Sequence, residues 1–197
     1  MTQAKLRFAT FEDYLNYDDG TDRRYELVDG RLVELPPESE PNDWIANYLF
    51  LAIANTGVVP PRLIRPGKCE IQVPVLQPND PANRYPDLVI LCEVHLTLTQ
   101  KRLTIKRDMP PPVLVAEVVS PGKTNRERDD ERKRDQYAQL GIPEYWLIDP
   151  EQQRVTVLEL KAGHYAEVGT FQGSDAILSP TFSNLQLTAN QILTMGM

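Results

Sequence analysis

The chain has few of the side chains that build metal clusters or disulfide frameworks. Its 197 residues include two cysteines, Cys69 and Cys92, and two histidines, His95 and His164. No paired CxxC motif is present and each histidine stands alone, so a zinc site is not expected. Both cysteines fall in predicted strands, and we expect them to be buried free thiols rather than a disulfide.

Long apolar runs are also missing. No stretch of eighteen apolar residues occurs, which argues against a transmembrane helix. The first fifteen residues lack the apolar core of a signal peptide, so we expect a cytoplasmic protein. With no internal repeat, low-complexity tract or linker, residues 1–197 are predicted to form a single domain.

Positive charge is scarce overall, with a formal net charge of −7. A protein that binds nucleic acid usually presents a basic surface. The charge is uneven, however: residues 1–60 carry eleven acids against five bases, and residues 61–110 carry eight bases against five acids. Two interpretations stay open, a basic zone near the functional site and a mixed, solvated surface.

Two carboxylates interrupt apolar, strand-like runs. Residues 88–91 and 113–119 are rich in β-branched residues without clear alternation, which is typical of strands buried on both faces. Asp87 precedes the first run, and Glu117 lies inside the second. Two buried carboxylates on neighbouring strands would repel each other, and their oxygen ligands suit Mg²⁺ or Mn²⁺. The plainer alternative is a strand-end residue and a structural ion pair with an arginine.

A charged helix is predicted over residues 124–140, ended by Gly141. Asp129, Lys133 and Tyr137 follow one another at intervals of four, so they share one helical face. A lysine aimed from this face at the two carboxylates could stabilise an attacking hydroxide or the charge that develops on the phosphoryl group. The competing interpretation of Lys133 is one more solvated charge.

The other segments complete the pattern of an α/β domain. Glu26 lies in the first strand of a hairpin that Asp29-Gly30 predicts, and it is either solvent-facing or part of a site. The aromatic residues of a helix over 42–55, Trp44 among them, are assigned to the core. Further predicted elements are a short helix that begins at a Thr10 capping box, a strand over 69–75, a strand that ends at Asp149, a hairpin over 154–168 and a short strand near 185–187.

Taken together, these motifs resemble a restriction-endonuclease family (Uma-type) that is abundant in cyanobacteria and belongs to the PD-(D/E)XK nuclease superfamily. The resemblance covers about residues 25–190. It is carried by Tyr25-Glu26-Leu27-Val28-Asp29-Gly30, Pro86-Asp87, Glu117-Val-Val-Ser120, Arg128-Asp129 with Lys133 and Tyr137, and Gly141-Ile-Pro-Glu-Tyr-Trp-x-x-Asp149. It implies a restriction-endonuclease-like mixed central sheet flanked by helices, with an N-terminal hairpin and a domain core of about 25–190.

The resemblance also implies an activity, a Mg²⁺-dependent endonuclease that hydrolyses DNA phosphodiester bonds. Asp87 and Glu117 would hold the metal, and Lys133 would complete the catalytic set. The superfamily usually has its lysine two residues after the acidic residue, where this chain has Val119. In this family the helix lysine, here Lys133, is thought to replace it.

Three further residues enter as accessory positions. The resemblance implies that Asp129 and Tyr137 position Lys133 and that Glu26 lies near the metal. Cleavage of both DNA strands would favour a homodimer. Two other functions remain open, a catalytically weak nuclease fold that serves binding or regulation, and a hydrolase of small phosphoesters. A basic groove wide enough for a duplex would favour the nuclease, and a narrow acidic pocket the small substrate.

Overall fold

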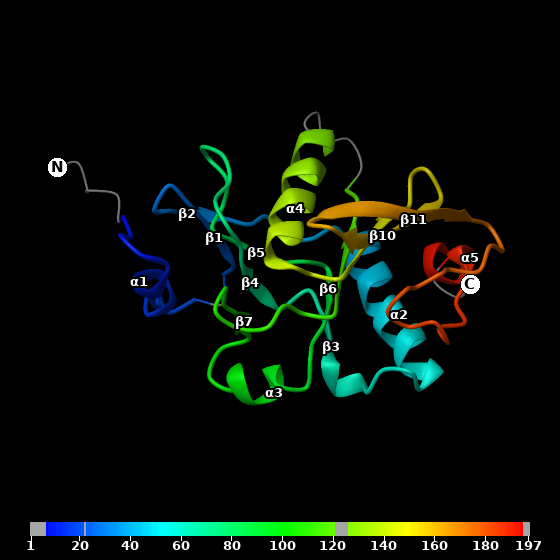
Figure 1. Cartoon of the computed structure of the whole chain (residues 1–197). Coiled ribbons are helices and arrows are strands. Elements are labelled where there is room, and N and C mark those ends of the chain that lie inside the picture. Colours follow the sequence, from blue (N-terminus) through cyan, green and yellow to red (C-terminus); the bar gives the residue numbers. More distant parts are fainter. Residues whose placement is uncertain (1–6, 22, 121–125, 195–197) are drawn as a thin grey trace.

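A six-stranded mixed sheet forms the centre of the protein (Figure 1). The computed structural model describes residues 7–21, 23–120 and 126–194, with the backbone alone for residues 126–130. In spatial order the strands of the central sheet are β11 (His164–Gln172), β10 (Arg154–Lys161), β9 (Glu144–Asp149), β8 (Leu114–Val118), β6 (Leu88–Ile90) and β3 (Ile64–Pro66). The predicted mixed sheet with flanking helices is therefore confirmed.

Smaller sheets and helices surround this centre. The hairpin predicted at Asp29-Gly30 is present as β1 (Tyr25–Val28) and β2 (Arg31–Glu34), and a three-stranded sheet consists of β5 (Asn83–Arg84), β4 (Glu70–Gln72) and β7 (Thr104–Ile105). The described helices are α1 (Phe11–Leu15), α2 (Glu40–Thr56), α3 (His95–Leu98), α4 (Arg126–Leu140) and α5 (Ala189–Leu193), with a 3₁₀ turn at Pro61–Leu63.

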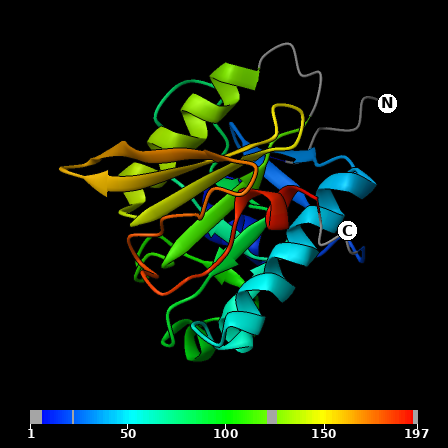
Figure 2. The same ribbon diagram turned by 90° about the vertical axis from the view of Figure 1, so that its right-hand side faces the viewer.

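The order β8–α4–β9 is a crossover between two adjacent parallel strands, the one parallel pair described in the central sheet. Such a connection needs a helix that packs back across the sheet. Figure 2 shows the sheet between α4 on one side and α2 on the other. Helix α4 ends at Gly141, whose φ of 76° is readily adopted by glycine. The crossover thus brings a charged helix over the strand that carries Glu117.

Helix α2 covers the opposite face. Ser39 caps it by accepting a hydrogen bond from the backbone N–H of Asn42, and Ile45, Leu49 and Ile53 are buried along one side. The prediction that Trp44 belongs to the core is wrong, because half of its surface is exposed. Trp44 neighbours Ile45 in sequence, so it points about 100° away from the buried face. An apolar helix with a broad hydrophobic side does not show from sequence where that side ends.

A buried polar network fixes the N-terminal hairpin against the three-stranded sheet. Glu70, 2% exposed, accepts hydrogen bonds from Tyr14 (2.7 Å), Asn83 (2.7 Å) and Thr104 (2.6 Å), and Arg102 lies 3.1 Å from its carboxylate. A buried carboxylate with this many donors is compensated. Asn83 links the network to the hairpin, because its amide donates to the carbonyl oxygen of Tyr25 and accepts from the N–H of Leu27. Strands β1 and β5 contribute to one side of the cavity described below.

The C-terminal segment departs from the sequence prediction. The strand predicted near 185–187 is not formed: the carbonyl oxygen of Leu187 accepts a 2.8 Å hydrogen bond from the N–H of Ile177, and the neighbouring pair Ala176 and Thr188 forms an isolated bridge. His95 is buried and bonded to the backbone of Cys92 and Pro110. Both cysteines are free, as predicted, but neither lies in a strand: Cys69 is buried just before β4, and Cys92, beyond the end of β6, is only partly buried. Within the described residues, none of the helices combines the length and apolar character that a membrane crossing requires.

Candidate active site

The two predicted carboxylates lie next to each other in the central sheet. Strands β6 and β8 are antiparallel with Leu88 opposite Ala116, so Asp87, immediately before β6, lies next to Glu117 on β8. Oδ2 of Asp87 accepts a 2.6 Å hydrogen bond from the backbone N–H of Val118. Glu117 is 6% exposed. The pairing register therefore brings together two acids that are thirty residues apart in the chain.

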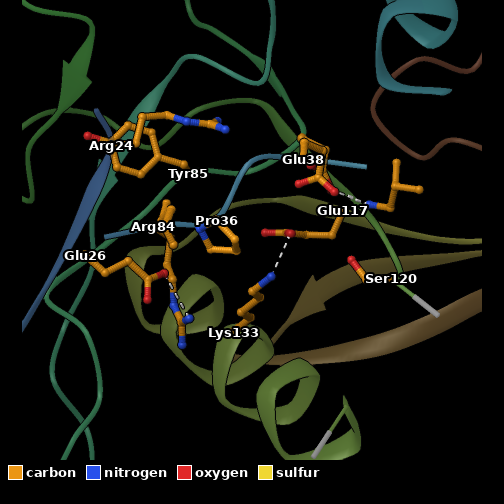
Figure 3. A pocket seen from close by; sticks show the side chains of 12 residues that line it. Arg24, Glu26, Pro36, Glu38, Arg84, Tyr85, Glu117, Ser120 and Lys133 are labelled. Carbon is orange, nitrogen blue, oxygen red and sulfur yellow. Dashed lines mark hydrogen bonds and ion pairs between the residues drawn. The ribbon is translucent and has the colours of Figure 1, made fainter. Parts of the chain in front are cut away.

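Helix α4 supplies two partners for Glu117. Nζ of Lys133 lies 2.8 Å from Oε2 of Glu117, and the hydroxyl of Tyr137 donates a 2.7 Å hydrogen bond to Oε1. Burial, followed by the nearby Glu117 carboxylate, raises the pKa of Tyr137 well above its usual value, so it stays a neutral donor. Figure 3 shows Lys133 reaching from the helix toward Glu117. Lys133 and Tyr137, on one face of α4, thus each bind one oxygen of the Glu117 carboxylate.

Asp87 is the member of the pair whose ionisation is disfavoured. Burial and then repulsion by Glu117 raise its pKa to about 7, against the opposing effects of the Val118 N–H and of Lys133. Near neutral pH, a second negative charge at this place is therefore costly. A divalent cation beside Asp87 and Glu117 would relieve that cost. The donor set suits Mg²⁺, which commonly binds through one or two carboxylates and takes its remaining ligands from water and substrate phosphate.

The pair opens into a cavity of about 220 Å³. Its charged lining combines four carboxylates with three cations, so it is neither uniformly basic nor uniformly acidic. The charged residues of the lining are Glu26, Glu38, Asp87, Glu117, Arg24, Arg84 and Lys133. Two of the cations are ion-paired with acids of the same lining, Lys133 with Glu117 and Arg84 with Glu26, so the charges of the lining largely balance one another.

Glu26 lines this cavity, and its carboxylate forms an ion pair with Arg84. Nη1 of Arg84 lies 3.2 Å from Oε1 of Glu26, and both side chains are largely buried. Nε of Arg84 in turn donates to Oε1 of Gln136, whose Nε2 donates to the carbonyl oxygens of Pro74 and Pro81. Figure 3 shows Glu26 beside Arg84. Glu26 is thus placed to act on the site through Arg84.

Residues at the beginning of α2 were missed by the sequence interpretation. Glu38 lines the cavity, and its negative charge adds to the elevation of the Asp87 pKa. Asn42, which is 1% exposed, donates to Oε1 of Glu38 and to Oγ of Ser120, the residue that follows the buried strand segment of Glu117. The one available signal was the polar residue Asn42 on the buried face of a predicted helix.

Two assignments at the site stay predictions, the role of Asp129 and the bound metal. The side chain of Asp129 lies outside the described residues, so its role in positioning Lys133 is not tested. Among the residues that are described, no group of three or more histidines, cysteines or acids could hold a metal ion. A cation at Asp87 and Glu117 would therefore depend on water, substrate or a backbone carbonyl, such as that of Val118, for its other ligands.

Comparisons with known proteins address the family and the fold. A family model described as "Uma2: Putative restriction endonuclease" matches residues 11–190. No curated protein matches the chain. A solved structure described as a "putative nuclease belonging to DUF820" from Anabaena variabilis is similar, with a TM-score of 0.67 and 17% sequence identity over 95% of this chain and 99% of that chain. At this identity the likeness shows a shared fold.

Proposed function

Because the chain belongs to the Uma2 family of nuclease-like proteins, we propose that it is a metal-dependent endonuclease that hydrolyses phosphodiester bonds in DNA. The observation that carries the proposal is the pair of Asp87, immediately before β6, and Glu117 on the adjacent antiparallel strand β8, with Nζ of Lys133 2.8 Å from Glu117. Two acids and one lysine beside one cavity are groups that metal-assisted phosphodiester hydrolysis uses.

Asp87 and Glu117 would hold Mg²⁺ or Mn²⁺. A bound ion of this kind polarises a phosphoryl oxygen and lowers the pKa of a coordinated water, which makes a nucleophile available near neutral pH. The protein's part is to orient both carboxylates. The Val118 N–H fixes one oxygen of Asp87, and the Tyr137 hydroxyl fixes one oxygen of Glu117.

Lys133 brings a positive charge to within 2.8 Å of Glu117. Its ammonium can shift from Glu117 to a negatively charged oxygen of the substrate, where charge develops in the transition state. Arg84 and Arg24 line the same cavity and can orient the non-bridging phosphate oxygens. Glu26 then has the accessory task of holding Arg84 in place, at 3.2 Å.

One observation favours the alternative of a weak or inactive nuclease fold that binds DNA or regulates. Both carboxylate oxygens of Glu117 already have partners, Lys133 and Tyr137. A cation must share these oxygens with the ammonium, which lowers its affinity. A small phosphoester would fill the cavity itself, about 220 Å³, whereas a DNA strand would have to extend beyond it. Cleavage assays separate these functions directly.

The deciding experiment measures Mg²⁺- or Mn²⁺-dependent cleavage of single-stranded and duplex DNA beside a small aryl phosphodiester. Wild type should cut DNA, and Asp87→Ala should not, while both should remain folded by circular dichroism. Cleavage of the small ester alone would favour the small-substrate hydrolase. DNA binding without cleavage under any metal would favour the regulatory module. Equal activity of the two proteins would remove Asp87 from the site.

A homodimer belongs to the same proposal. The described part of the chain holds one Asp87–Glu117 pair, and each such pair serves one scissile phosphate at a time. Two copies related by a two-fold axis would cut the two antiparallel strands of a duplex. Light scattering of the protein alone and with duplex DNA tests this arrangement, which predicts a stable dimer in at least one of the two states.

A further inference from the structure

A second hollow adjoins the active-site cavity. It has a volume of about 980 Å³ and shares Arg24, Glu38, Tyr85 and Asp87 with the cavity. Pockets for single small ligands measure about 300–1,000 Å³, so this groove alone reaches the upper end of that range. Since it is continuous with the site of the two acids, a substrate that reaches Asp87 has room to extend well beyond one phosphodiester.

The two walls of the groove differ in charge. One wall is the end of β3 with the turn that follows it, and it carries Arg65 and Lys68. The other wall is the first half of α2 and the residues before it, which carry Glu38 and Asp43. An anion in the groove is therefore drawn to the β3 wall and away from α2.

Backbone contacts tie the basic wall to the catalytic pair. The N–H of Gly67 donates to the carbonyl oxygen of Asp87 at 2.8 Å, and the carbonyl oxygen of Gly67 accepts from Nη1 of Arg24 at 2.6 Å. Gly67 has φ 57°, and a Cβ built there would meet no atom within 4 Å. The two hydrogen bonds of Gly67 thus fix the turn between Arg65 and Lys68 relative to Asp87, while the side of the turn where a Cβ would point is open.

The geometry points to a binding subsite for the polynucleotide strand on one side of the bond to be cut, with Arg65 and Lys68 contacting its backbone phosphates. This inference rests on the proposed function and extends it, because it commits to a polymeric substrate. The guanidinium of Arg24 lies 5.8 Å from the centroid of the Tyr85 ring, at the junction shared by cavity and groove. A strand passing this junction meets positive charge on the way from Asp87 to Lys68.

The test compares the variant Arg65→Gln/Lys68→Gln with a matched control, Arg154→Gln/Lys161→Gln. Both remove two positive charges and keep the side-chain stems. Strand β10, which carries the control residues, lies near the end of the sheet opposite to β3. Fluorescence anisotropy with chelator present would measure affinity for a labelled single-stranded oligonucleotide and for a dinucleotide, over a range of salt. Thermal melting would verify that each variant folds.

The expected result is a several-fold loss of oligonucleotide affinity in Arg65→Gln/Lys68→Gln alone. The slope of log affinity against log salt should fall in magnitude by about 1.4, since each phosphate contact on a single strand contributes about 0.7. The dinucleotide, which has no flanking phosphate, should lose much less. An unchanged slope, or an equal loss in the control variant, would overturn the subsite.

The outcome is separable from that of the proposed function. If wild type cuts DNA with Mg²⁺ and Arg65→Gln/Lys68→Gln binds the oligonucleotide like wild type, the endonuclease stands and the subsite falls. If wild type cuts nothing but the variant still loses binding and salt slope, the subsite stands as a strand-binding groove and the endonuclease falls.

Discussion

The ammonium of Lys133 lies 2.8 Å from the carboxylate of Glu117, although sixteen residues separate them in the chain. The resemblance to PD-(D/E)XK nucleases predicts a lysine two residues after the acid on the same strand, where side chains at i and i+2 share one face. Here that position is Val119, which is buried and 8% exposed. Helix α4 packs over this strand in the crossover to β9, so the helix delivers an equivalent charge to the same carboxylate.

A divalent cation should stabilise the protein through Asp87 and Glu117. We expect Mg²⁺ or Mn²⁺ to raise the melting temperature of wild type, by mass action, and to leave the double variant Asp87→Asn/Glu117→Gln unaffected. Differential scanning fluorimetry over a metal titration measures both. Ca²⁺ serves as a comparison ion, because it takes more ligands than this pair offers. Matching titration curves for the two proteins would remove the metal site.

The pKa of Asp87, about 7, predicts a pH-dependent stability. The folded protein retains a proton on this group at pH values where the unfolded chain has lost it. Its ionisation therefore costs folding free energy, progressively from about pH 4 to about pH 7 and in full above that. In chelator, Asp87→Asn should melt several degrees above wild type at pH 8 and lose this advantage near pH 4.

The control for this experiment is Asp108→Asn, because the Asp108 side chain is 75% exposed. It should change the melting temperature little at either pH. A constant difference between Asp87→Asn and wild type across the pH range would show that the carboxylate is not repelled in the folded protein. With metal present the sign should reverse, since the cation favours the ionised form that Asn cannot provide.

The sequence could predict those site residues that interrupt an apolar strand pattern or share one face of a helix. Asp87 and Glu117 stood out as charges in apolar runs, and the β6–β8 register turned them into neighbours. Lys133 and Tyr137 stood out by helical spacing. Glu38 and Gln136 did not, because a polar residue in a loop or in a charged helix looks solvated until packing buries it. The prediction that Trp44 is buried was wrong for the opposite reason: the sequence of an apolar helix does not show which side is left exposed.

Gln136 should prove more important for stability than its type suggests. It is fully buried, bonds to Arg84, and donates to two proline carbonyl oxygens at 2.8 and 3.0 Å. Replacing it by Leu keeps its size but leaves three buried polar groups without this partner. Each costs about 1–3 kcal/mol, so urea denaturation should show a loss of several kcal/mol. The exposed Gln139 on the same helix provides the control.

In that comparison, Gln139→Leu should leave the denaturation midpoint nearly unchanged. Gln136→Leu should also weaken substrate binding, because Arg84 lines the cavity and loses one of its anchors. A Gln136→Leu protein as stable as wild type would mean that water or rearranged side chains satisfy the freed groups.

Changing Lys133 to Met tests the helix-lysine mechanism most directly. If the ammonium contacts only the transition state, turnover should fall by about 10²–10³-fold, as for other single electrostatic contacts. Metal binding should survive, because lysine is not a ligand. Without metal, however, the variant should be less stable than wild type, since Glu117 loses its cation and remains buried beside Asp87.

Mg²⁺ should therefore raise the melting temperature of Lys133→Met by more than that of wild type, because the ion supplies the missing positive charge. Arg134→Met is the matched control: it removes one positive charge from the next residue of α4, which does not line the cavity. It should retain turnover and the wild-type response to metal. The helix lysine is excluded from catalysis if both variants lose turnover alike, or if Lys133→Met cleaves DNA at the wild-type rate while its metal-free stability falls.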